Sequence, residues 1–255
     1  MASCQSSGIQ YWDQTLLQLH QLGLTRRDSQ VRISFAYLFR VRVHDKYMLV
    51  QNEHRSSVYQ PIGGAYQYNP REIKFLIENF QVRNDFGDIP DISKPGDYRL
   101  LVPGIYLKSF LQRFDQTTDR ESIADLSREF VEETIDTDIL SFSKIKYRFC
   151  GRHISKIHFS DFYQCYELLI ADIVELLPDN DQFNSLSKHL SCSPSNLLFA
   201  TSLEVENTQM IGQVFEDKPT IAEHTYKILC QNENSLYRGT DDSHTRTYEV
   251  ELKRP

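Results

Sequence analysis

Apolar and polar positions alternate along the N-terminal half of the chain. Val31, Ile33 and Phe35 are separated by single residues, and apolar positions continue from 38 to 43. A polar turn at 44–46 leads into a second apolar run. Because neighbouring residues of a strand point to opposite faces, this alternation is typical of half-buried strands. The pattern therefore predicts a long β-hairpin over residues 31–50.

Apolar residues recur at helical spacing in other segments. Residues 10–23 and 107–114 each carry such a stripe, which predicts a helix. Asn69-Pro70 is a typical N-cap and first-turn pair, so a third helix is expected to begin there. The remaining expectations are strands at 98–102, 144–149, 158–170, 197–205 and 247–252, a connection at 151–156, a loop with a short helix at 176–196, and a helix at 220–229.

Strands and helices are mixed along the chain without an internal repeat or an obvious linker. This organisation predicts one α+β domain over residues 1–255. Residues 1–28 are expected to form an N-terminal helical extension. Residues 232–255 are polar and are expected to form a C-terminal tail.

Composition narrows the classes of function. The chain has 255 residues, 40% of them hydrophobic, and a formal net charge of −7. An acidic protein of this kind is not expected to bind duplex nucleic acid, which needs a basic face. The five cysteines form no close pair, so a zinc ribbon is not expected. With no apolar window long enough for a membrane span and no signal sequence, we expect a soluble, cytoplasmic protein.

A run of acidic residues dominates the middle of the chain. A helix predicted over about Arg120–Ile135 would gather its acidic residues on one side, since positions three and four apart share a face. Those residues are Glu121, Asp125, Glu129, Glu132 and Glu133. Their mutual repulsion would be relieved by a hard divalent cation such as Mg²⁺ or Mn²⁺. A solvated acidic face without a metal is the alternative interpretation.

The order of residues in this segment resembles a known motif. Residues 128–133, Arg-Glu-Phe-Val-Glu-Glu, match the Arg-Glu-apolar-any-Glu-Glu core of the Nudix box. Gly63-Gly64 resembles the glycines that open that box. The resemblance implies an α/β/α sandwich around a mixed β-sheet. It also implies that Glu129, Glu132 and Glu133 are catalytic metal ligands, that Arg128 supports them, and that Gly63 and Gly64 contact the substrate.

The chain differs from the usual box at three points. Residues 65–127 separate Gly64 from Arg128, so a long insertion, residues 65–120, precedes the motif helix. Ile135 stands where the box has a glycine after its glutamates. Arg120 stands where the upstream glutamate is expected, with Glu121 one position away.

Several segments together resemble a narrower group, the SMODS-associated Nudix domain of bacterial antiphage systems of the CBASS type. They are residues 35–43, 59–66 and 97–104, and Arg120-Glu121-Ser122 leading into the motif. The resemblance covers roughly residues 30–230. It implies a nucleotide or cyclic oligonucleotide ligand and a functional link to a CD-NTase-like cyclase. It leaves the state of assembly open, with a homodimer as one expectation.

Other polar groups are candidates for the site. Arg152 and His153 could bind a substrate phosphate, since an arginine fork matches phosphate oxygens. His158 and His224 are candidates of the same kind, although single histidines are more often structural. Glu204 and Glu206 are expected on one face of a strand end, as a further metal ligand or as solvated charges. The tyrosines at 37, 59, 66 and 68 could stack on a base or pack in the core.

Two functions remain open from the sequence. In the first, Mg²⁺ or Mn²⁺ held by the three glutamates assists hydrolysis of a phosphoanhydride in a nucleoside-diphosphate derivative or signalling nucleotide. In the second, the same fold binds a cyclic oligonucleotide as a sensor or effector without turnover. The first is preferred, because all three glutamates of the motif are present.

Overall fold

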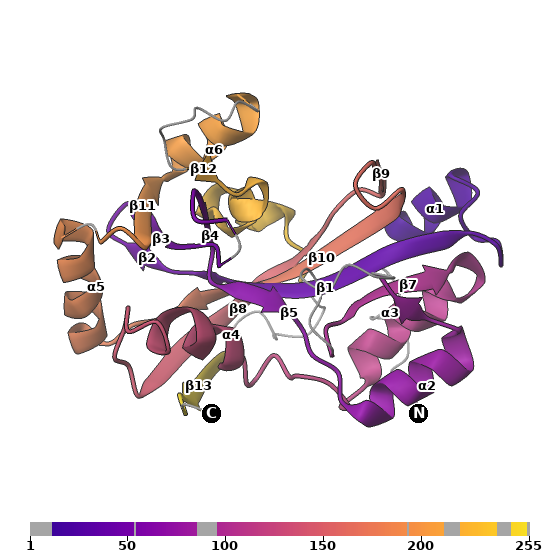
Figure 1. Ribbon diagram of the computed structural model, residues 1–255, viewed down its shortest axis with the longest axis horizontal. Helices are drawn as coiled ribbons and strands as arrows, with labels where there is room; N and C mark the ends of the chain where they lie inside the picture. The colour runs from indigo at the N-terminus through magenta and orange to yellow at the C-terminus, as the bar shows by residue number, and fades with distance from the viewer. Residues whose placement is uncertain are drawn as a thin grey trace, which may run out of the picture.

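The computed structural model describes residues 12–53, 55–85, 96–192, 194–211, 220–238 and 246–253. Residues 1–11, 54, 86–95, 193, 212–219, 239–245, 254 and 255 lie outside these ranges. An eight-stranded mixed sheet is the largest element of the fold (Figure 1). Its main path runs β13-β8-β10-β1-β7-β6, with β5 paired to β1 and β9 to β10. The strands are β1 Gln30–Arg40, β5 Gly63–Ala65, β6 Arg83–Asn84, β7 Arg99–Pro103, β8 Lys144–Ile154, β9 His158–Ser160, β10 Cys165–Leu176 and β13 Thr247–Glu251.

The central strand β1 is buried on both faces. It pairs in parallel with β10 from Val31–Tyr166 to Arg40–Glu175, and antiparallel with β7 and β5. Its burial on both sides explains the continuous apolar run toward its C-terminal end, because a strand covered on both faces need not alternate. The alternation of the sequence therefore predicts the strand but not its central position.

A smaller second sheet continues from the end of β1. Its order is β11-β3-β4-β12, with β2 paired to β3. The strands are β2 Arg42–Val43, β3 Lys46–Gln51, β4 Val58–Gln60, β11 Leu197–Thr201 and β12 Thr220–Ile221. The predicted turn at 44–46 is confirmed, with His44 in the left-handed region at φ 58°.

Helices α2 and α3 and the motif helix lie on one side of the large sheet, below it in Figure 1. The α-helices are α1 Asp13–Gln21, α2 Pro70–Phe80, α3 Leu107–Gln116, α4 Arg128–Phe130, α5 Asn180–Cys192 and α6 Ser202–Ile211. Aromatic rings fill this layer: Phe35 stacks on Phe114 with centroids 3.5 Å apart, and Phe39 meets Phe130 edge-on at 5.3 Å. The insertion is thus a folded part of the domain, since it supplies α2, β7 and α3.

The other face of the large sheet is covered by two 3-10 helices, η3 (Glu223–Ile228) and η4 (Cys230–Ser235). Ile228 and Leu229 pack there in a second apolar cluster with Leu38 and Ile173. Arg40, fully buried, holds this layer by donating from Nε to the Ile228 carbonyl and from Nη1 to Glu233 at 2.9 Å. Helical layers on both faces of a mixed sheet form the α/β/α sandwich expected from the resemblance.

Several predicted elements are confirmed. The helix at Asn69-Pro70 is α2, and the Asn69 side chain accepts hydrogen bonds from the backbone of Arg71 and Glu72. The helices α1 and α3 and the strands β7 and β13 also lie where the patterns predict them. The predicted helix at 220–229 is confirmed only over Glu223–Ile228, as the 3-10 helix η3, because Thr220–Ile221 form strand β12.

The connection predicted at 151–156 is wrong. Strand β8 continues to Ile154, and the turn that leads back into the sheet lies at 161–164. Gly151 has φ 137°, and its backbone passes close to Leu236 and Tyr237. This glycine therefore lets the segment at 236–237 pack against the middle of β8, and it does not form a turn. A glycine that accommodates a neighbouring chain has the same appearance in the sequence as one that ends a strand.

Candidate functional site

The paired glycines of β5 lie directly behind the glutamates of the candidate site and do not line its pocket. Gly63 has φ 146°, and a Cβ atom there would overlap the Tyr37 carbonyl of β1. A Cβ atom on Gly64 would overlap the carboxylate of Glu129. Both positions therefore require glycine, one for its backbone conformation and one for the close approach of the motif helix.

Arg128 ties the motif helix to the sheet. Its Nη2 donates to the Ala65 carbonyl at 2.8 Å and to Glu121 Oε2 at 3.3 Å. Its Nη1 donates to Glu129 Oε1 at 2.5 Å and lies 3.7 Å from Glu132 Oε1. The guanidinium thus holds three carboxylates and one strand of the sheet, the orienting role that the resemblance implies for Arg128.

The motif helix is shorter than predicted. It begins at Arg128 as α4 and continues through η2, Val131–Ile135, as a π-type turn in which the Asp136 amide donates to the Val131 carbonyl. The prediction of a helix from Arg120 is wrong because the preceding segment bonds elsewhere. The Glu121 amide donates to the Gln67 carbonyl, and the Ser122 hydroxyl accepts from Ala124, a local turn that competes with a helix.

Glu121 nevertheless reaches the site from this non-helical segment. Its carboxylate accepts from Arg128, from the Gln67 amide at 3.2 Å and from the Tyr37 hydroxyl at 3.3 Å. Burial raises the pKa of Glu121, and the Arg128 guanidinium opposes this shift. The fold therefore compensates for the one-residue offset of this glutamate in the sequence.

The three motif glutamates line one pocket of about 520 Å³. Two further acidic residues, Glu53 and Asp136, line it as well. The rest of the lining is apolar Ile139 and five polar, uncharged residues, Gln51, Asn52, Ser56, Thr137 and Asn196. Among the described residues that line this pocket there is no lysine, arginine or histidine, so the pocket is strongly acidic.

Glu133 is the most strongly perturbed acid of the pocket. Its Oε2 accepts from the Gly63 amide at 2.8 Å, and its Oε1 accepts from the Gln60 amide group at 3.1 Å. Burial raises the pKa of Glu133 to about 8, the Gly63 hydrogen bond opposes this, and the charges of Glu129 and Glu132 add to the rise. A buried carboxylate beside two others is the electrostatic situation that a cation relieves.

The donor set suits a hard divalent cation. The acidic side chains that line the pocket offer carboxylate oxygens, which are the ligands that Mg²⁺ and Mn²⁺ prefer. In the part of the chain that the structure describes, however, no three His, Cys, Asp or Glu side chains are grouped closely enough to hold a metal ion. Arg128 and the Gly63 amide bind the carboxylates of Glu129 and Glu133 instead.

Arg152 and His153 do not line the acidic pocket. Arg152 is engaged by two aspartates, with Nε 2.7 Å from Asp172 Oδ1 and Nη1 2.7 Å from Asp115 Oδ1. His153 follows it on β8, so its side chain points to the opposite face of the sheet. The structure thus separates the two residues that the sequence places side by side.

The expectation that Glu204 and Glu206 share a strand face is wrong, since both lie on helix α6. Strand β11 ends at Thr201, and the Glu204 carboxylate accepts from the Thr201 amide at 2.7 Å. This bond caps the start of α6 and lowers the pKa of Glu204. Glu206 accepts a hydrogen bond from Gln231. Neither residue lines the acidic pocket.

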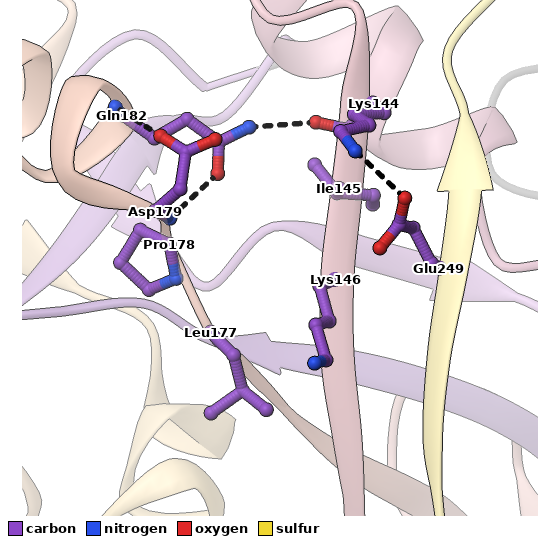
Figure 2. Close-up of a pocket in the computed structure, with 8 residues that line it drawn as sticks. All are labelled: Lys144, Ile145, Lys146, Leu177, Pro178, Asp179, Gln182 and Glu249. Atoms are coloured by element: carbon purple, nitrogen blue, oxygen red, sulfur yellow. Dashed lines mark hydrogen bonds and ion pairs between the residues drawn. The ribbon is translucent and has the colours of Figure 1, made fainter.

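A second pocket, of about 310 Å³, lies where β8 and β13 meet the start of α5 (Figure 2). Its polar groups bond to one another: Lys144 Nζ lies 2.8 Å from Glu249, and the Gln182 side chain donates to the Lys144 carbonyl at 2.7 Å. These bonds join the ends of the strands to α5. We assign this pocket a structural role, because its hydrogen-bonding groups already have protein partners.

Sequence reasoning did not select Gln60, Glu53 or Asp136 for the site, and it considered Tyr37 only for stacking on a base or packing in the core. Gln60 ends β4 in the small sheet, and Tyr37 lies on β1 opposite Gly64 of β5. Only the tertiary fold shows that Gln60 reaches Glu133 and that Tyr37 reaches Glu121. Asp136 directly follows the motif helix, and Glu53 lies beyond the end of β3. The proximity of Asp136 to Glu132 and Glu133 in the sequence is a signal that could have identified it.

A mixed sheet between helical layers, with an Arg-Glu-apolar-any-Glu-Glu helix packed against a glycine strand, defines a Nudix domain. The chain belongs to the family of the SMODS-associated NUDIX domain, whose profile matches residues 30–229. No curated protein and no solved structure matches the chain significantly. Within the described residues, no helix has both the length and the apolar character to cross a membrane.

Proposed function

We propose that this chain is a divalent-metal-dependent nucleotide phosphohydrolase, with the acidic pocket as its site. The observation that carries this proposal is the gathering of Glu129, Glu132 and Glu133 in one pocket, with Glu53 and Asp136 beside them. A nucleotide phosphate is itself anionic, so it would be repelled by this wall of carboxylates. A bridging divalent cation is the simplest means of binding it there. Nudix proteins in general use divalent metals, and their ligands are nucleotide-related.

The residues of the chain have distinct roles in this proposal. Glu129, Glu132 and Glu133 would hold Mg²⁺ or Mn²⁺, which supplies neutralisation of phosphate charge and polarisation of the phosphoanhydride. Arg128 would keep Glu129 and Glu121 in place from the sheet side. Gly63 and Gly64 would allow the motif helix to pack close against β5, and a bound cation would relieve the burial and mutual repulsion that raise the pKa of Glu133.

The test is a phosphate-release assay with Mg²⁺ or Mn²⁺ against nucleoside-diphosphate derivatives, dinucleoside polyphosphates and cyclic oligonucleotides. Turnover that requires metal and disappears in Glu132→Gln is the expected result. Glu78→Gln, which removes one acidic group from an exposed position on α2, is the matched control and should leave turnover unchanged. Equal turnover in wild type and Glu132→Gln would disprove the proposed site.

The second candidate is a nucleotide sensor or effector without turnover, in a CBASS-type antiphage system. It is supported by the engagement of Glu129 with Arg128 and of Glu133 with Gly63, which leaves no grouped metal ligands in the described residues. In this case one cyclic oligonucleotide should stabilise the protein in a thermal-shift assay, with no product formed over hours. Size-exclusion chromatography with and without this ligand would reveal a homodimer or larger assembly if ligand binding changes the elution volume.

A further inference from the structure

The face of the large sheet opposite the motif helix carries a group of basic side chains that the proposed hydrolase does not use. His153 of β8 pairs with Ala171 of β10, which in turn pairs with Ala36 of β1. Cross-strand neighbours point to the same face, so these three side chains share one side. Ala36 is partly exposed, although its neighbours Phe35 and Tyr37 on the other face are fully buried. Ala36 is therefore the accessible small side chain of this face, whereas Ala171 is buried at 3% exposure.

Helix η3 contributes the other members of this group. His224 and Lys227 are three residues apart, and in a 3-10 helix such residues lie one above the other. The adjacent Tyr226 hydroxyl lies 3.2 Å from His153 Nε2, and the two rings meet edge-on at 5.5 Å. This contact places η3 directly beside His153.

Two nitrogen atoms of this group lack a partner in the described part of the chain. Lys227 is only 7% exposed, and no hydrogen bond or ion pair joins its ammonium group to a described residue; Nζ is not among the fully buried polar atoms, so it reaches solvent. His153 Nδ1 is buried without a hydrogen-bond partner. When the Tyr226 hydroxyl donates to Nε2, the imidazole proton resides on Nδ1, which then needs an acceptor.

Basic groups predominate in this region, and Glu223, which precedes His224 on η3, is an acidic group among them. Burial lowers the pKa of Lys227 to about 8. Burial and the charge of Lys227 lower the pKa of His153 and of His224 to about 4, and Arg99 adds to the effect on His224. Arg99 itself pairs with Asp97 at 3.4 Å. A charged basic group at a buried position is unfavourable unless it loses its proton or an anion accompanies it.

We propose that His153, His224 and Lys227 form an anion-binding site that takes a phosphate group, separate from the acidic pocket. A phosphate offers several acceptor oxygens, so it can accept bonds from Lys227 Nζ and from two imidazoles at once. A metal cation is disfavoured at the same place by the charge of Lys227. The site extends the proposed function without depending on it, since its ligand requires no divalent cation.

The experiment is an NMR titration of the full chain with labelled histidines, in EDTA and at constant ionic strength. Inorganic phosphate should shift the imidazole resonances of His153 and His224 saturably and raise the pKa of both. His20 and His44, which are exposed, should not respond. Parallel titrations with AMP and adenosine identify the source of the phosphate. Tighter binding of AMP than of inorganic phosphate indicates a nucleotide, and equal binding indicates free phosphate.

Lys227→Met provides the second measurement. The variant should bind phosphate at least about tenfold more weakly, because a charged hydrogen-bond donor is lost. Without phosphate its melting temperature should rise by a few degrees, because a buried unpaired charge is removed. Lys146→Met, at an exposed position on β8, should change neither property.

Three results would overturn the proposal: no saturable shift at either histidine, equal binding of adenosine and AMP, or an unchanged phosphate response in Lys227→Met. If Lys227→Met does not fold, the wild-type titration decides the question. The same titration in Glu132→Gln keeps the two proposals apart. If phosphate still shifts the histidine resonances of Glu132→Gln, the phosphate binds at His153, His224 and Lys227 and not in the acidic pocket, whether or not the variant retains turnover.

Discussion

The absence of a side chain at Gly64 allows the carboxylate of Glu129 to lie directly against β5. The carboxylate of Glu129 occupies the space that a Cβ atom on Gly64 would need, so the motif helix and β5 pack in direct contact. The distance between Glu129 and Arg128 depends on this packing, because Arg128 also bonds to the carbonyl of Ala65 in β5. The glycine is therefore part of the site although it contributes no chemistry.

We expect Gly64→Ala to reduce metal-dependent turnover by about tenfold or more, since displaced catalytic groups lose orientation. The free energy of unfolding should fall by only about 1–2 kcal/mol, as for moderate overpacking. Steady-state kinetics and urea denaturation measure the two effects. Gly23→Ala is the control: Gly23 has φ 68° and open space around it, so that variant should lose stability without losing turnover. A parallel loss in both variants would contradict this explanation.

His153 and His224 should make the protein sensitive to mild acid. Their pKa values are lowered to about 4 in the folded chain, below the ordinary value of an unfolded histidine. The unfolded state therefore binds more protons, and stability should be lost as the pH falls from about 6.5 toward 4. At pH 5 each histidine should account for about 1 kcal/mol, allowing for partial exposure.

Urea denaturation at pH 7.5 and pH 5 tests this expectation. The double variant His153→Gln, His224→Gln should lose less stability between the two pH values than the wild type. His20→Gln, at an exposed position, should behave as the wild type. The buried Lys227 and the partly exposed Arg99 are the cationic groups that act on these imidazoles. If the double variant loses as much stability as the wild type, the histidines do not carry the acid sensitivity.

The short motif helix and strand β5 form one unit at the level of elements. Two polar connections join them: Arg128 to the Ala65 carbonyl, and the Gly63 amide to Glu133. A helix of one α-turn continued by a π-type turn has few internal bonds of its own. Its position therefore depends on these connections and on the burial of Phe130.

Arg128→Met should destabilise the protein by about 2–3 kcal/mol, because Glu121 and Glu129 then lose their shared cationic partner. Both carboxylates are 12% exposed, so water cannot fully replace the arginine. Denaturant unfolding with an unchanged slope measures this loss. Arg71→Met, on the exposed start of α2, is the matched control and should have little effect. A loss below about 0.5 kcal/mol for Arg128→Met would show that the connection is not needed.

The elements with local signals could be predicted from the sequence. The Asn69 cap and the alternation of β1 are local features, and both elements are present. The start of the motif helix could not be predicted, because Glu121 bonds to Gln67, a residue distant in the chain. Likewise the capping bond from Glu204 to Thr201 converts a predicted strand end into a helix start. Tertiary partners, rather than propensity, decide these boundaries.

Only the part of the candidate site that has a local sequence signal could be predicted. The motif identifies Arg128 and the three glutamates as a group, and the structure places those glutamates in one pocket. Arg152 and His153 are adjacent in the chain but point to opposite faces of β8, a separation that follows once the strand is known to continue through them. The sequence alone does not reveal that β8 extends to Ile154, so it could not show that Arg152 and His153 point to opposite faces.

At the scale of the whole molecule, β13 closes one edge of the large sheet. It pairs antiparallel with β8 from Thr247–Arg148 to Glu251–Lys144, and Tyr248 packs on Tyr147. Without it, a strand of 11 residues, β8, would become the edge. Exposed edges of that length pair readily with other chains. The polar C-terminal segment thus includes a protective strand.

Deletion of residues 246–255 should make the protein associate in a concentration-dependent manner and lower its melting temperature. Light scattering after size-exclusion chromatography measures the association. Deletion of residues 253–255 is the control, because it leaves β13 and the bond from the Leu252 amide to the Ser143 carbonyl intact. A longer deletion that stays monomeric and equally stable would show that β13 does not protect the edge.

The parallel pairing of β1 with β10 also affects how the chain reaches this fold. The paired residues Val31 and Tyr166 are about 135 positions apart in the chain. During synthesis β1 emerges first, and its main partner follows only after about ten seconds at ordinary rates of translation. Such long-range pairing slows folding and leaves an apolar strand uncovered meanwhile. The nascent chain is therefore expected to occupy a chaperone until β10 leaves the ribosome, and slower translation of the segment before β10 should lower the yield of soluble protein.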